Sequence, residues 1–375
     1  MAAVALAVAV SGQPASAGGT PQYTLTEIDL PSFGRASALN NSEWVTGTIT
    51  LSETEGRAYL YRDGEVQDLG TLGGETSVAV DINESGEILG SSTYGGDLTG
   101  SAFLYKDGVM QDLGILIGMP ATATGLNNNG QVTGGASVTA LDAHAYIYDE
   151  DGFTDLGTLG GHNSQGFGIN DQGMVTGQSS VSGDLYLHAF LYHDGGMEDL
   201  GTLGCCDSVG NDINERGDVA GQTSAPESTV SHPVNHAFLY SDGVMHDLGT
   251  LGGGYGVAYA VNQDRKVTGT SSTGEPSEFH AFLYADGVMH DLNDLVSPND
   301  PLAPKVTLLD GVDINDDGVI VANGFNAETG IYTVYLLTPI KNGGGGATGE
   351  REIGLLALLV AVSRVLRRRY VRRPA

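Results

Sequence analysis

Cysteines, basic side chains and long apolar runs are all scarce in this chain of 375 residues. The only cysteines, Cys205 and Cys206, are adjacent, so no set of disulfides between distant segments holds the fold together. Packing of the core must therefore stabilise it. The sequence also lacks a Gly-x-Ser-x-Gly turn, a His-Glu-x-x-His helix and a phosphate-binding P-loop. We therefore predict no catalytic residue, and carboxylates are too abundant for any one pair to mark a glycoside-hydrolysis site.

Basic side chains are few and concentrated at the C-terminus. The chain has 16 lysines and arginines against 46 aspartates and glutamates, which gives a formal charge of -30. Half of the basic residues lie from Lys341 onward, so the rest of the chain is more acidic still. A field of this sign repels phosphate, which argues against nucleic acid and anionic lipid as partners. It suits cations and salty surroundings, or it serves only to keep an extracellular protein soluble.

No apolar run is long enough for an ordinary transmembrane helix. The last one, Ile353–Leu366, would span about 21 Å as a helix, against a hydrocarbon core of about 30 Å. It follows a glycine-rich linker over residues 341–352, and with the basic cluster Arg367–Arg369 it makes residues 353–375 a short apolar segment with a basic tail. We expect this cluster to stay cytoplasmic and the body to lie outside, weakly or transiently anchored.

The N-terminal segment is typical of a secretory signal. The apolar run Ala2–Val10 is followed by Ala15–Ala17, a small-x-small cleavage pattern, so we expect residues 1–17 to be removed on export. The basic residues that usually precede such a run are missing, which is consistent with a true start upstream of Met1. We therefore expect an extracellular or cell-surface protein.

Two phrases recur through residues 18–340. One reads His-Ala-Phe-Leu-Tyr, an Asp-Gly turn and Asp-Leu-Gly-Thr-Leu-Gly-Gly, most clearly over His236–Gly253. The other reads Ile-Asn-x-x-Gly-x-Val-x-Gly, as in Ile169–Gly177. The asparagine of the second phrase occurs at Asn40, Asn83, Asn127, Asn170, Asn214, Asn262 and Asn315. The spacings of 43 to 53 residues are typical of propeller blades. We predict an all-β fold, a seven-bladed β-propeller of four-stranded antiparallel blades.

Turn chemistry and burial both support this unit, whose strands we letter a to d in chain order. The asparagine accepts hydrogen bonds from backbone N–H groups ahead of it, and the glycine three residues later adopts the left-handed conformation that closes a tight turn. Strand c, Ala-Phe-Leu-Tyr, is apolar on both faces and must be covered on both sides, as in a blade between two others. A parallel β-helix is the main rival, but its coils are usually shorter than this unit and need no pair of tight hairpins.

The two ends of the repeat region are complementary. Tyr23–Gly34 matches the end of a unit, because Asp29–Gly34 aligns with Asp247–Gly252. The last unit ends at Tyr335–Ile340 with strand c and no strand d. We therefore predict that the N-terminal strand completes the last blade, which closes the ring and removes its open edges.

The His-Ala-Phe phrase resembles that of the HAF-repeat family of extracellular repeat proteins, roughly from Tyr23 to Ile340. Copies depart from the pattern at Arg57 and Ser101, where the histidine is absent, and over Asp112–Gly118. The resemblance implies export and a repeat fold, and it implies no reaction. The Gly-rich, apolar and Arg-rich C-terminal series resembles GlyGly-CTERM sorting signals, which implies cleavage by a membrane-embedded rhomboid-type protease. A plain weak anchor is the alternative.

Aligning the repeats with one another locates their insertions. From the hairpin glycine to the strand-c tyrosine the distance is 14 or 15 residues, except for 19 in the fifth unit. From the Thr-Leu leucine to the next asparagine it is 11, except for 20 in the last complete unit. In an up-and-down blade the b–c and d–a connections emerge at one rim, which we predict to be the binding face. Its candidate residues are Tyr94, Asp97, Asp184, Tyr186, Glu227, His232, Glu275 and Phe279 from b–c connections, and Glu75, His162, Cys205, Asp207 and Tyr255 from d–a connections.

Each of these residues taken singly also fits an ordinary solvated loop, and the recurrent histidines have a structural explanation too. They occupy one position on successive copies of strand c, too far apart to share one metal ion, so we expect a repeated structural hydrogen bond. These histidines are His144, His188, His236 and His280.

Two short motifs leave alternatives open. Asp313, Asn315 and Asp317 resemble the start of an EF-hand loop, but the twelfth position, where a bidentate acid is expected, is glycine. Ca²⁺ is therefore a weak candidate there, and no other cofactor is predicted. Cys205 and Cys206 could form a vicinal disulfide, bond to a partner thiol or remain free.

Three functional hypotheses follow. The first is an exported, non-enzymatic binding or structural scaffold, a monomer whose partner is an extracellular protein or a glycan. The alternative is a propeller hydrolase or lyase that acts on extracellular polysaccharide with acids near the central opening. A third is a calcium-stabilised surface adhesin.

Overall fold

The computed structural model describes residues 22–95, 100–114, 121–183, 185–229, 232–274 and 278–341. The chain divides into two compact units, Met1–Pro339 and Ile340–Ala375, and the described strands all belong to the first. The predicted signal peptide, the tail and the linker beyond residue 341 lie outside the described residues.

Four-stranded antiparallel sheets follow one another along the chain. The first two contain β2 (Gly34–Leu39), β3 (Val45–Thr50), β4 (Gly56–Arg62) and β5 (Glu65–Asp68), then β6 (Ser77–Ile82), β7 (Ile88–Thr93), β8 (Gly100–Lys106) and β9 (Val109–Asp112). Two more contain β18 (Ser208–Ile213), β19 (Val219–Ser224), β20 (Asn235–Ser241) and β21 (Val244–Gly249), then β22 (Gly256–Val261), β23 (Val267–Ser272), β24 (Phe279–Ala285) and β25 (Val288–Asp291). A short helix, α1 (Leu292–Leu295), follows β25.

The middle of the chain forms one eight-stranded sheet. Its strands are β10 (Ala121–Leu126), β11 (Val132–Ser137), β12 (Ala143–Asp149), β13 (Gly152–Asp155), β14 (Gly160–Ile169), β15 (Val175–Val181), β16 (Leu187–His193) and β17 (Gly196–Gly201). The halves β10–β13 and β14–β17 are each ordered like the other sheets, and the single parallel pair between Ala143 and Asn163 joins them.

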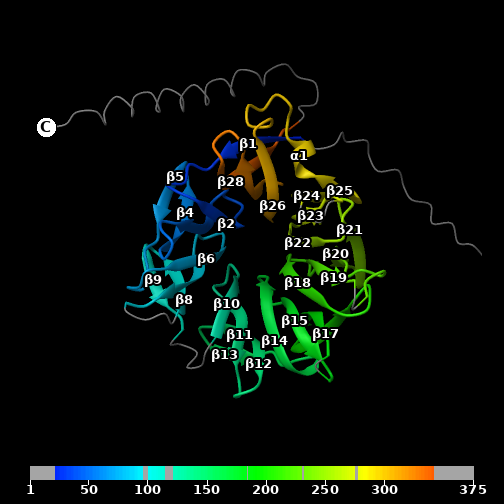
Figure 1. The fold of residues 1–375 in the computed structure, drawn as a ribbon. Coiled ribbons are helices and arrows are strands. Elements are labelled where there is room, and N and C mark those ends of the chain that lie inside the picture. Colours follow the sequence, from blue (N-terminus) through cyan, green and yellow to red (C-terminus); the bar gives the residue numbers. More distant parts are fainter. Residues whose placement is uncertain are drawn as a thin grey trace, which may run out of the picture. The chain divides into compact units, whose positions relative to one another are not determined.

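The last sheet combines both ends of the first unit. It contains β26 (Val306–Ile314), β27 (Ile320–Asn326), β28 (Ile331–Pro339) and the N-terminal β1 (Tyr23–Glu27), which pairs antiparallel with β28. Within this unit β2, β6, β10, β14, β18, β22 and β26 lie toward a common centre, and β1 lies on the outside (Figure 1). The predicted all-β class and the four-stranded antiparallel sheets are confirmed.

The turns use the predicted chemistry. The side-chain Oδ1 of Asn170 accepts hydrogen bonds from the N–H groups of Gln172 and Met174, and Gly173 has a φ of 73°. In the next hairpin Asp194 and Gly195 have φ values of 51° and 76°, as a two-residue turn between strands requires. Local side-chain and glycine preferences thus set the length of each hairpin.

Strand c forms the core of each sheet. Ala189 and Phe190 are fully buried and Leu191 is 8% exposed, so neighbouring sheets cover both faces as predicted. Burying one such phenylalanine contributes about 1.5–3 kcal/mol. The same position holds Phe103, Phe238 and Phe282 in other sheets, all fully buried.

The Thr-Leu part of the repeat joins one sheet to the next in four copies of the described chain. The N–H of Leu159 donates to Oγ of Ser179 on the following strand b, at 2.8 Å. The N–H of Ala145 on strand c donates to Oγ of Ser164 on the following strand a, also at 2.8 Å. The repeated phrases are therefore occupied in holding the sheets together.

The longest d–a connection contacts the N-terminal strand. This segment, residues 296–305, packs along the outer edge of β1. The N–H of Ser297 donates to the carbonyl of Tyr23, and Oδ2 of the buried Asp300 accepts the N–H of Leu25, both at 2.8 Å. It satisfies backbone groups on the edge of β1 that would otherwise be open.

The glycine that ends the Val-x-Gly phrase lets strand b approach both its neighbour and the strand-c phenylalanine. A Cβ on Gly221 would lie 1.9 Å from the carbonyl oxygen of Val209 and 2.8 Å from the ring of Phe238. The backbone at this point has no room for a side chain.

We therefore predict that Gly221→Ala lowers the free energy of unfolding by at least about 2 kcal/mol, because the added methyl overpacks the core. The control is Gly254→Ala, whose new Cβ would meet nothing within 4 Å and should change stability by no more than about 0.5 kcal/mol. Urea unfolding followed by fluorescence measures both. Equal stability of the two variants would contradict this account of the repeat glycine.

Candidate functional site

The b–c and d–a connections share one rim, here called the loop rim. Short parallel bridges join the start of a strand c to the next d–a connection, between Gly56 and Thr76 and between Asn235 and Tyr255. The N–H of Leu187 likewise donates to Oδ1 of Asp207 at 2.9 Å. The loop rim is thus a continuous surface across neighbouring sheets.

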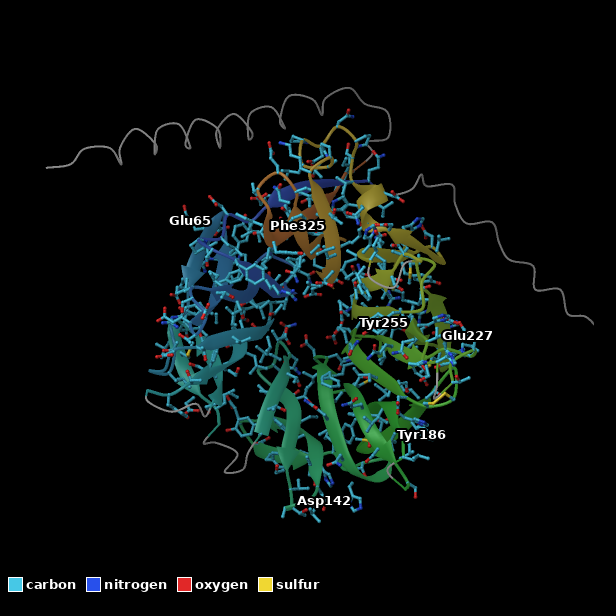
Figure 2. All side chains as sticks on the ribbon, viewed as in Figure 1. Glu65, Asp142, Tyr186, Glu227, Tyr255 and Phe325 are labelled. Atoms are coloured by element: carbon cyan, nitrogen blue, oxygen red, sulfur yellow. A yellow bond between two sulfur atoms is a disulfide. The ribbon has the colours of Figure 1, made fainter. Side chains whose placement is uncertain are left out.

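A cavity of about 420 Å³ opens on the loop rim above β18 and β19. Its walls come from the β15–β16 connection, which supplies Leu185 and Tyr186, from the β17–β18 connection, which supplies Cys206 and Asp207, and from the β19–β20 connection. Tyr186 and Glu227 are labelled in Figure 2, where the yellow bond of a disulfide is visible beside them. Three connections of the loop rim, one of them the insertion of the fifth unit, therefore build one concave site.

The longest b–c connection is folded on itself beside this cavity. The N–H of Ala225 donates to the carbonyl of Val234, and Thr229 and His232 exchange two backbone hydrogen bonds. Oγ of Ser228, which is buried, accepts the N–H of Val234 at 3.0 Å. These bonds give the insertion a defined shape, so it can present a fixed surface.

The cysteines are joined to each other, which selects one of the three alternatives left open by the sequence. Cys205 and Cys206 form a vicinal disulfide, and Cys206 lines the cavity. Other copies of the repeat have Glu75, His162 or Gly254 at the position of Cys206.

One polar atom of the cavity wall has no partner. Oε1 of Gln222 on β19 is enclosed, and no group in the described part of the chain donates a hydrogen bond to it. An enclosed acceptor left unpaired costs roughly 1–3 kcal/mol. Oγ1 of Thr48, at the same position of strand b in β3, is unpaired as well, so the missing hydrogen bond does not by itself mark a ligand site.

The other predicted rim residues have varied surroundings. Tyr94 donates to Asp112, and Nδ1 of His162 contacts Oδ1 of Asp142 at 2.7 Å. Tyr255 and Phe279 form an edge-to-face pair with ring centroids 5.7 Å apart, and both rings are over a third exposed. Glu227 lies 3.5 Å from Nε2 of His236, and Glu75 accepts a hydrogen bond through its carbonyl from Arg57. Asp97, Asp184 and Glu275 lie outside the described residues.

Of the predicted residues, Tyr186 and Asp207 line the cavity itself, and Cys206 does so with them. Leu185, Gln222 and Ser228 also line it and were not predicted. Leu185 and Ser228 belong to b–c connections of the predicted rim, whereas Gln222 and other lining residues of β18, β19 and β20 are on regular strands and give no such signal in the sequence.

The recurrent histidines make the predicted structural hydrogen bond. In each case Nδ1 contacts the carboxylate of the aspartate that begins the Asp-Leu-Gly phrase eleven residues on. The pairs are His144 with Asp155, His188 with Asp199, His236 with Asp247, and His280 with Asp291, at 2.5–2.9 Å. The histidines therefore join strand c to strand d within one sheet.

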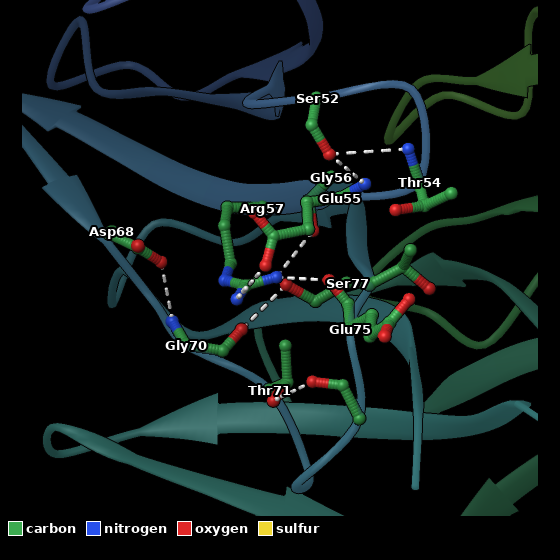
Figure 3. A network of polar contacts seen from close by, with 12 residues as sticks. Ser52, Thr54, Glu55, Gly56, Arg57, Asp68, Gly70, Thr71, Glu75 and Ser77 are labelled. Carbon is green, nitrogen blue, oxygen red and sulfur yellow. Dashed lines mark hydrogen bonds and ion pairs between the residues drawn. The ribbon is translucent and has the colours of Figure 1, made fainter. Parts of the chain in front are cut away.

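The two copies without histidine satisfy this position differently. Ser101 donates to Oδ1 of Asp112 at 2.6 Å and so replaces the histidine directly. Arg57 instead reaches the carbonyls of Gly56 and Glu75, while Asp68 accepts the N–H of Gly70 (Figure 3). The position is structural in all these copies.

The repeat asparagines form a circuit of hydrogen bonds around the inner ends of the sheets. Each side-chain Nδ2 donates to the backbone carbonyl of the next asparagine, at 2.9–3.4 Å. The order is Asn40, Asn83, Asn127, Asn170, Asn214, Asn262, Asn315 and again Asn40. The asparagine side chain thus accepts hydrogen bonds within its own turn through Oδ1 and donates one to the next sheet through Nδ2.

Three aspartates beside this circuit join neighbouring sheets. Oδ2 of Asp313 accepts the N–H of Leu39 at 2.8 Å, and the same bond recurs from Asp81 and Asp212 to the next sheet. Burial raises the pKa of Asp81 to about 7 and that of Asp313 to about 8, and it raises the pKa of Asp212 in the same direction. The charge of Asp212 adds to the increase at the other two.

The EF-hand-like segment takes part in these contacts. Asp313 accepts two backbone N–H groups, and Asn315 belongs to the asparagine circuit. Within the described ranges, no three or more His, Cys, Asp or Glu side chains are grouped to hold a metal ion. The side chains of Asp313 and Asn315 are thus committed to joining sheets.

No family model matches the sequence, and no curated protein matches it either. Solved structures do resemble the fold. The β-propeller domain of the Trilobed protease from Pyrococcus furiosus, which has an open velcro topology, is 11% identical with a TM-score of 0.51, over 84% of this chain and 100% of that one. A prolyl endopeptidase is 8% identical with a TM-score of 0.50, over 86% of this chain and 51% of that one. TolB from Acinetobacter baumannii is 10% identical with a TM-score of 0.45, and this chain spans 64% of its length.

These likenesses concern the fold alone, and with the four-stranded sheets they identify a β-propeller. Among the described residues, no helix is long and apolar enough to cross a membrane.

Proposed function

We propose that this chain is a non-enzymatic binding scaffold that contacts its partner through the loop rim. The observation that carries the proposal is the cavity there, because the insertion of the fifth unit and two other loop-rim connections line it. The repeated side chains are engaged in joining strands and sheets, as the His–Asp pairs and the asparagine circuit illustrate. The surface free to differ between repeats is the loop rim, and loops on a rigid scaffold commonly carry binding.

The test is to incubate the full chain with a panel of immobilised extracellular polysaccharides and to measure retention and product release together. We expect retention without turnover, weakened by Tyr255→Ser on the loop rim. The matched control is Val288→Ser, which removes an exposed apolar side chain at the opposite rim. Released oligosaccharides would contradict the proposal and support a hydrolase or lyase. Equal retention of the two variants would show that the loop rim is not the contact face.

We also propose that the sheets are seven blades of a closed ring, with β1 as the fourth strand of the last blade. The pairing of β1 with β28 supports this, as does the hydrogen bond from Asn315 to Asn40. The two halves of the eight-stranded sheet count as separate blades, because only one residue pair joins them. A closed ring would keep the loop rim rigid.

Export and surface attachment are part of the same proposal. The predicted signal over residues 1–17 and the tail over residues 353–375 support it, together with the resemblance to HAF repeats and to GlyGly-CTERM signals. We propose a monomer whose tail is cut by a membrane-embedded protease. Cell fractionation of the full chain and of a chain ending at residue 352 tests this, since only the full chain should pass through the membrane fraction.

A further inference from the structure

We propose that the Cys205–Cys206 disulfide is a thiol-exchange site on the loop rim. It reacts stoichiometrically with neutral or cationic thiols and opens to two cysteine thiols while the sheets stay folded. This chemistry goes beyond the proposed binding function and does not depend on it.

The disulfide adds little to the stability of the fold. A disulfide stabilises mainly by restricting the unfolded chain, and the effect increases with the length of the loop that it closes. Because Cys205 and Cys206 are adjacent, this bond closes no loop between separate segments. The next d–a connection reaches its strand b without cysteine, since the N–H of Gly253 donates to the carbonyl of Ser272 at 3.0 Å. The bond is therefore not required to join the sheets.

The connection that carries the disulfide is built differently from its counterparts. Oγ1 of Thr250 donates to the carbonyl of Gly253, three residues ahead, whereas Oγ1 of Thr202 donates to the carbonyl of Gly204, only two residues ahead. A Cβ on Gly253 would lie 2.0 Å from Oγ of a serine on strand b, so that place excludes cysteine. Gly204 takes it in the fifth unit, where a Cβ would lie 2.0 Å from the carbonyl oxygen of Ala225. The two cysteines follow this contact instead of making it.

The disulfide is open to a reagent in solution. Cys205 is exposed, and Cys206 is half-buried and lines the cavity of about 420 Å³. A small thiol can therefore approach from solvent without unfolding the chain, and Cys205 is the more accessible of the two cysteines. Reactive disulfides require this access.

The exchange takes place in two steps. The thiolate of an external thiol attacks Sγ of Cys205, the S–S bond breaks, and Cys206 leaves as a thiolate that takes a proton from water. A second external thiolate attacks the outer sulfur of the mixed disulfide and releases Cys205, which is protonated in turn. Two external thiols thus become one external disulfide, and their two electrons reduce the protein disulfide to two thiols.

Charge determines which thiols react. Asp207, which is exposed, directly follows Cys206, and the formal charge of the whole chain is -30. No lysine or arginine is present among the described residues of the cavity wall. An anionic thiol is repelled on approach, and a cationic thiol is attracted and offsets the charge of the departing Cys206 thiolate.

The experiment incubates the full chain without denaturant in cysteamine or, separately, in mercaptopropionate. Alkylation at increasing times followed by intact-mass measurement counts the opened disulfides, because the chain has no other cysteine. Each rate is divided by the rate of the same thiol with an uncharged small-molecule disulfide, which removes differences in intrinsic reactivity. We expect the normalised rate to be at least about tenfold higher with cysteamine, and high salt to reduce the difference. The reduced chain should unfold at the same urea concentration as the oxidised one.

Two variants locate the charge that selects the thiol. Asp207→Asn should lower the preference for cysteamine at least about twofold. It keeps the hydrogen bond to Leu187, since Oδ1 of Asn163 accepts the N–H of Ala143 at the corresponding position of the preceding unit. The matched control is Asp286→Asn, which removes the same charge from the β24–β25 turn at the opposite rim and should react as the wild type does.

Three results would overturn the inference. A disulfide that opens only in denaturant, or a reduced chain that unfolds at a much lower urea concentration, would show that the bond is structural. Equal normalised rates with the two thiols, or an equal preference in the two asparagine variants, would show that local charge does not select the thiol. Retention on polysaccharides is measured without thiols, so the proposed binding function holds or fails separately.

Discussion

A chain that begins at Asp29, and so lacks β1, is expected not to fold into a stable monomer. Tyr23, Leu25 and Ile28 are 2%, 9% and 1% exposed, and burying each contributes roughly 1.5–3 kcal/mol. Their loss removes about 5–9 kcal/mol, which is comparable to the total stability of about 5–15 kcal/mol that folded proteins usually have. Circular dichroism and size-exclusion chromatography measure the loss of cooperative unfolding and of the monomer.

The same deletion leaves β28 as an open edge and leaves the residues 296–305 without their partner strand. An open, apolar edge favours self-association. A peptide of residues 22–30 added in trans should therefore restore the monomer, and the same peptide with Leu25→Asp and Ile28→Asp should not. A stable monomer without any peptide would show that β1 contributes little.

The second large effect is on the pH dependence of stability, where the buried aspartates should make the free energy of unfolding fall as pH rises from about 4 to about 8. The pKa of Asp81 is raised to about 7 and that of Asp313 to about 8, against about 3.9 for aspartate in an unfolded chain. Between these values the folded state holds protons that the unfolded state has released. The stabilising contribution of these aspartates is fully present below the unfolded pKa and is lost as pH rises to the folded pKa, with a slope of about 1.4 kcal/mol per pH unit for each such group between the two values.

Urea unfolding at several pH values measures this slope, and Asp313→Asn should make it shallower. A second contribution of the same sign comes from His193, because Glu198 and Asp194 raise its pKa and its stabilising charge is lost as pH rises. His193→Asn measures that contribution alone. If Asp313→Asn leaves the slope as in the wild type, the buried aspartates do not govern the pH dependence.

The scaffold could be predicted from the sequence largely because it is repeated. The burial of Phe190, the turn at Asn170 and the His188–Asp199 contact depend on local patterns that occur several times, so each copy supports the interpretation of the others. Alignment of the repeats also placed Tyr186 and Asp207 on the predicted rim, and both line the cavity.

Contacts between sheets could not be predicted in the same way. The bond from Asn170 to Asn214 joins residues 44 apart, and that from Asp313 to Leu39 joins residues 274 apart. No local preference of either partner indicates such a bond, because the backbone carbonyl or N–H carries no sequence signal. The sequence shows that the asparagine recurs, but it does not show that the side chain donates a hydrogen bond to the next sheet.

The length of an insertion alone also did not show whether the connection stabilises the fold or lines a cavity. The two longest insertions look equivalent in the sequence, yet residues 296–305 hold β1 through Asp300, whereas the β19–β20 connection walls the cavity. The difference arises from position: the first insertion follows α1 and lies beside the N-terminal strand, whose outer edge needs hydrogen bonds. Residues 296–305 are engaged in the fold because they lie next to the N-terminal strand, whereas the β19–β20 connection has no such neighbour to hold.

The central claim is that the repeats form a ring closed by the N-terminal strand, which leaves the loop rim for binding. It is tested most directly by Thr24→Cys with Thr338→Cys, in a chain with Cys205→Ala and Cys206→Ala. These two exposed residues are opposite each other on β1 and β28, where directly paired Cα atoms are about 4.5–5.5 Å apart and within reach of a disulfide.

Intact-mass and peptide mass spectrometry of dilute, oxidised protein should find nearly complete intramolecular linkage of the two cysteines. The control pairs Thr24→Cys with Thr329→Cys, which lies nine residues back along the chain beyond the far end of β28 and should remain unlinked. Linkage of the control to the same extent, or linkage of residues 24 and 338 only between separate molecules, would contradict the closed ring.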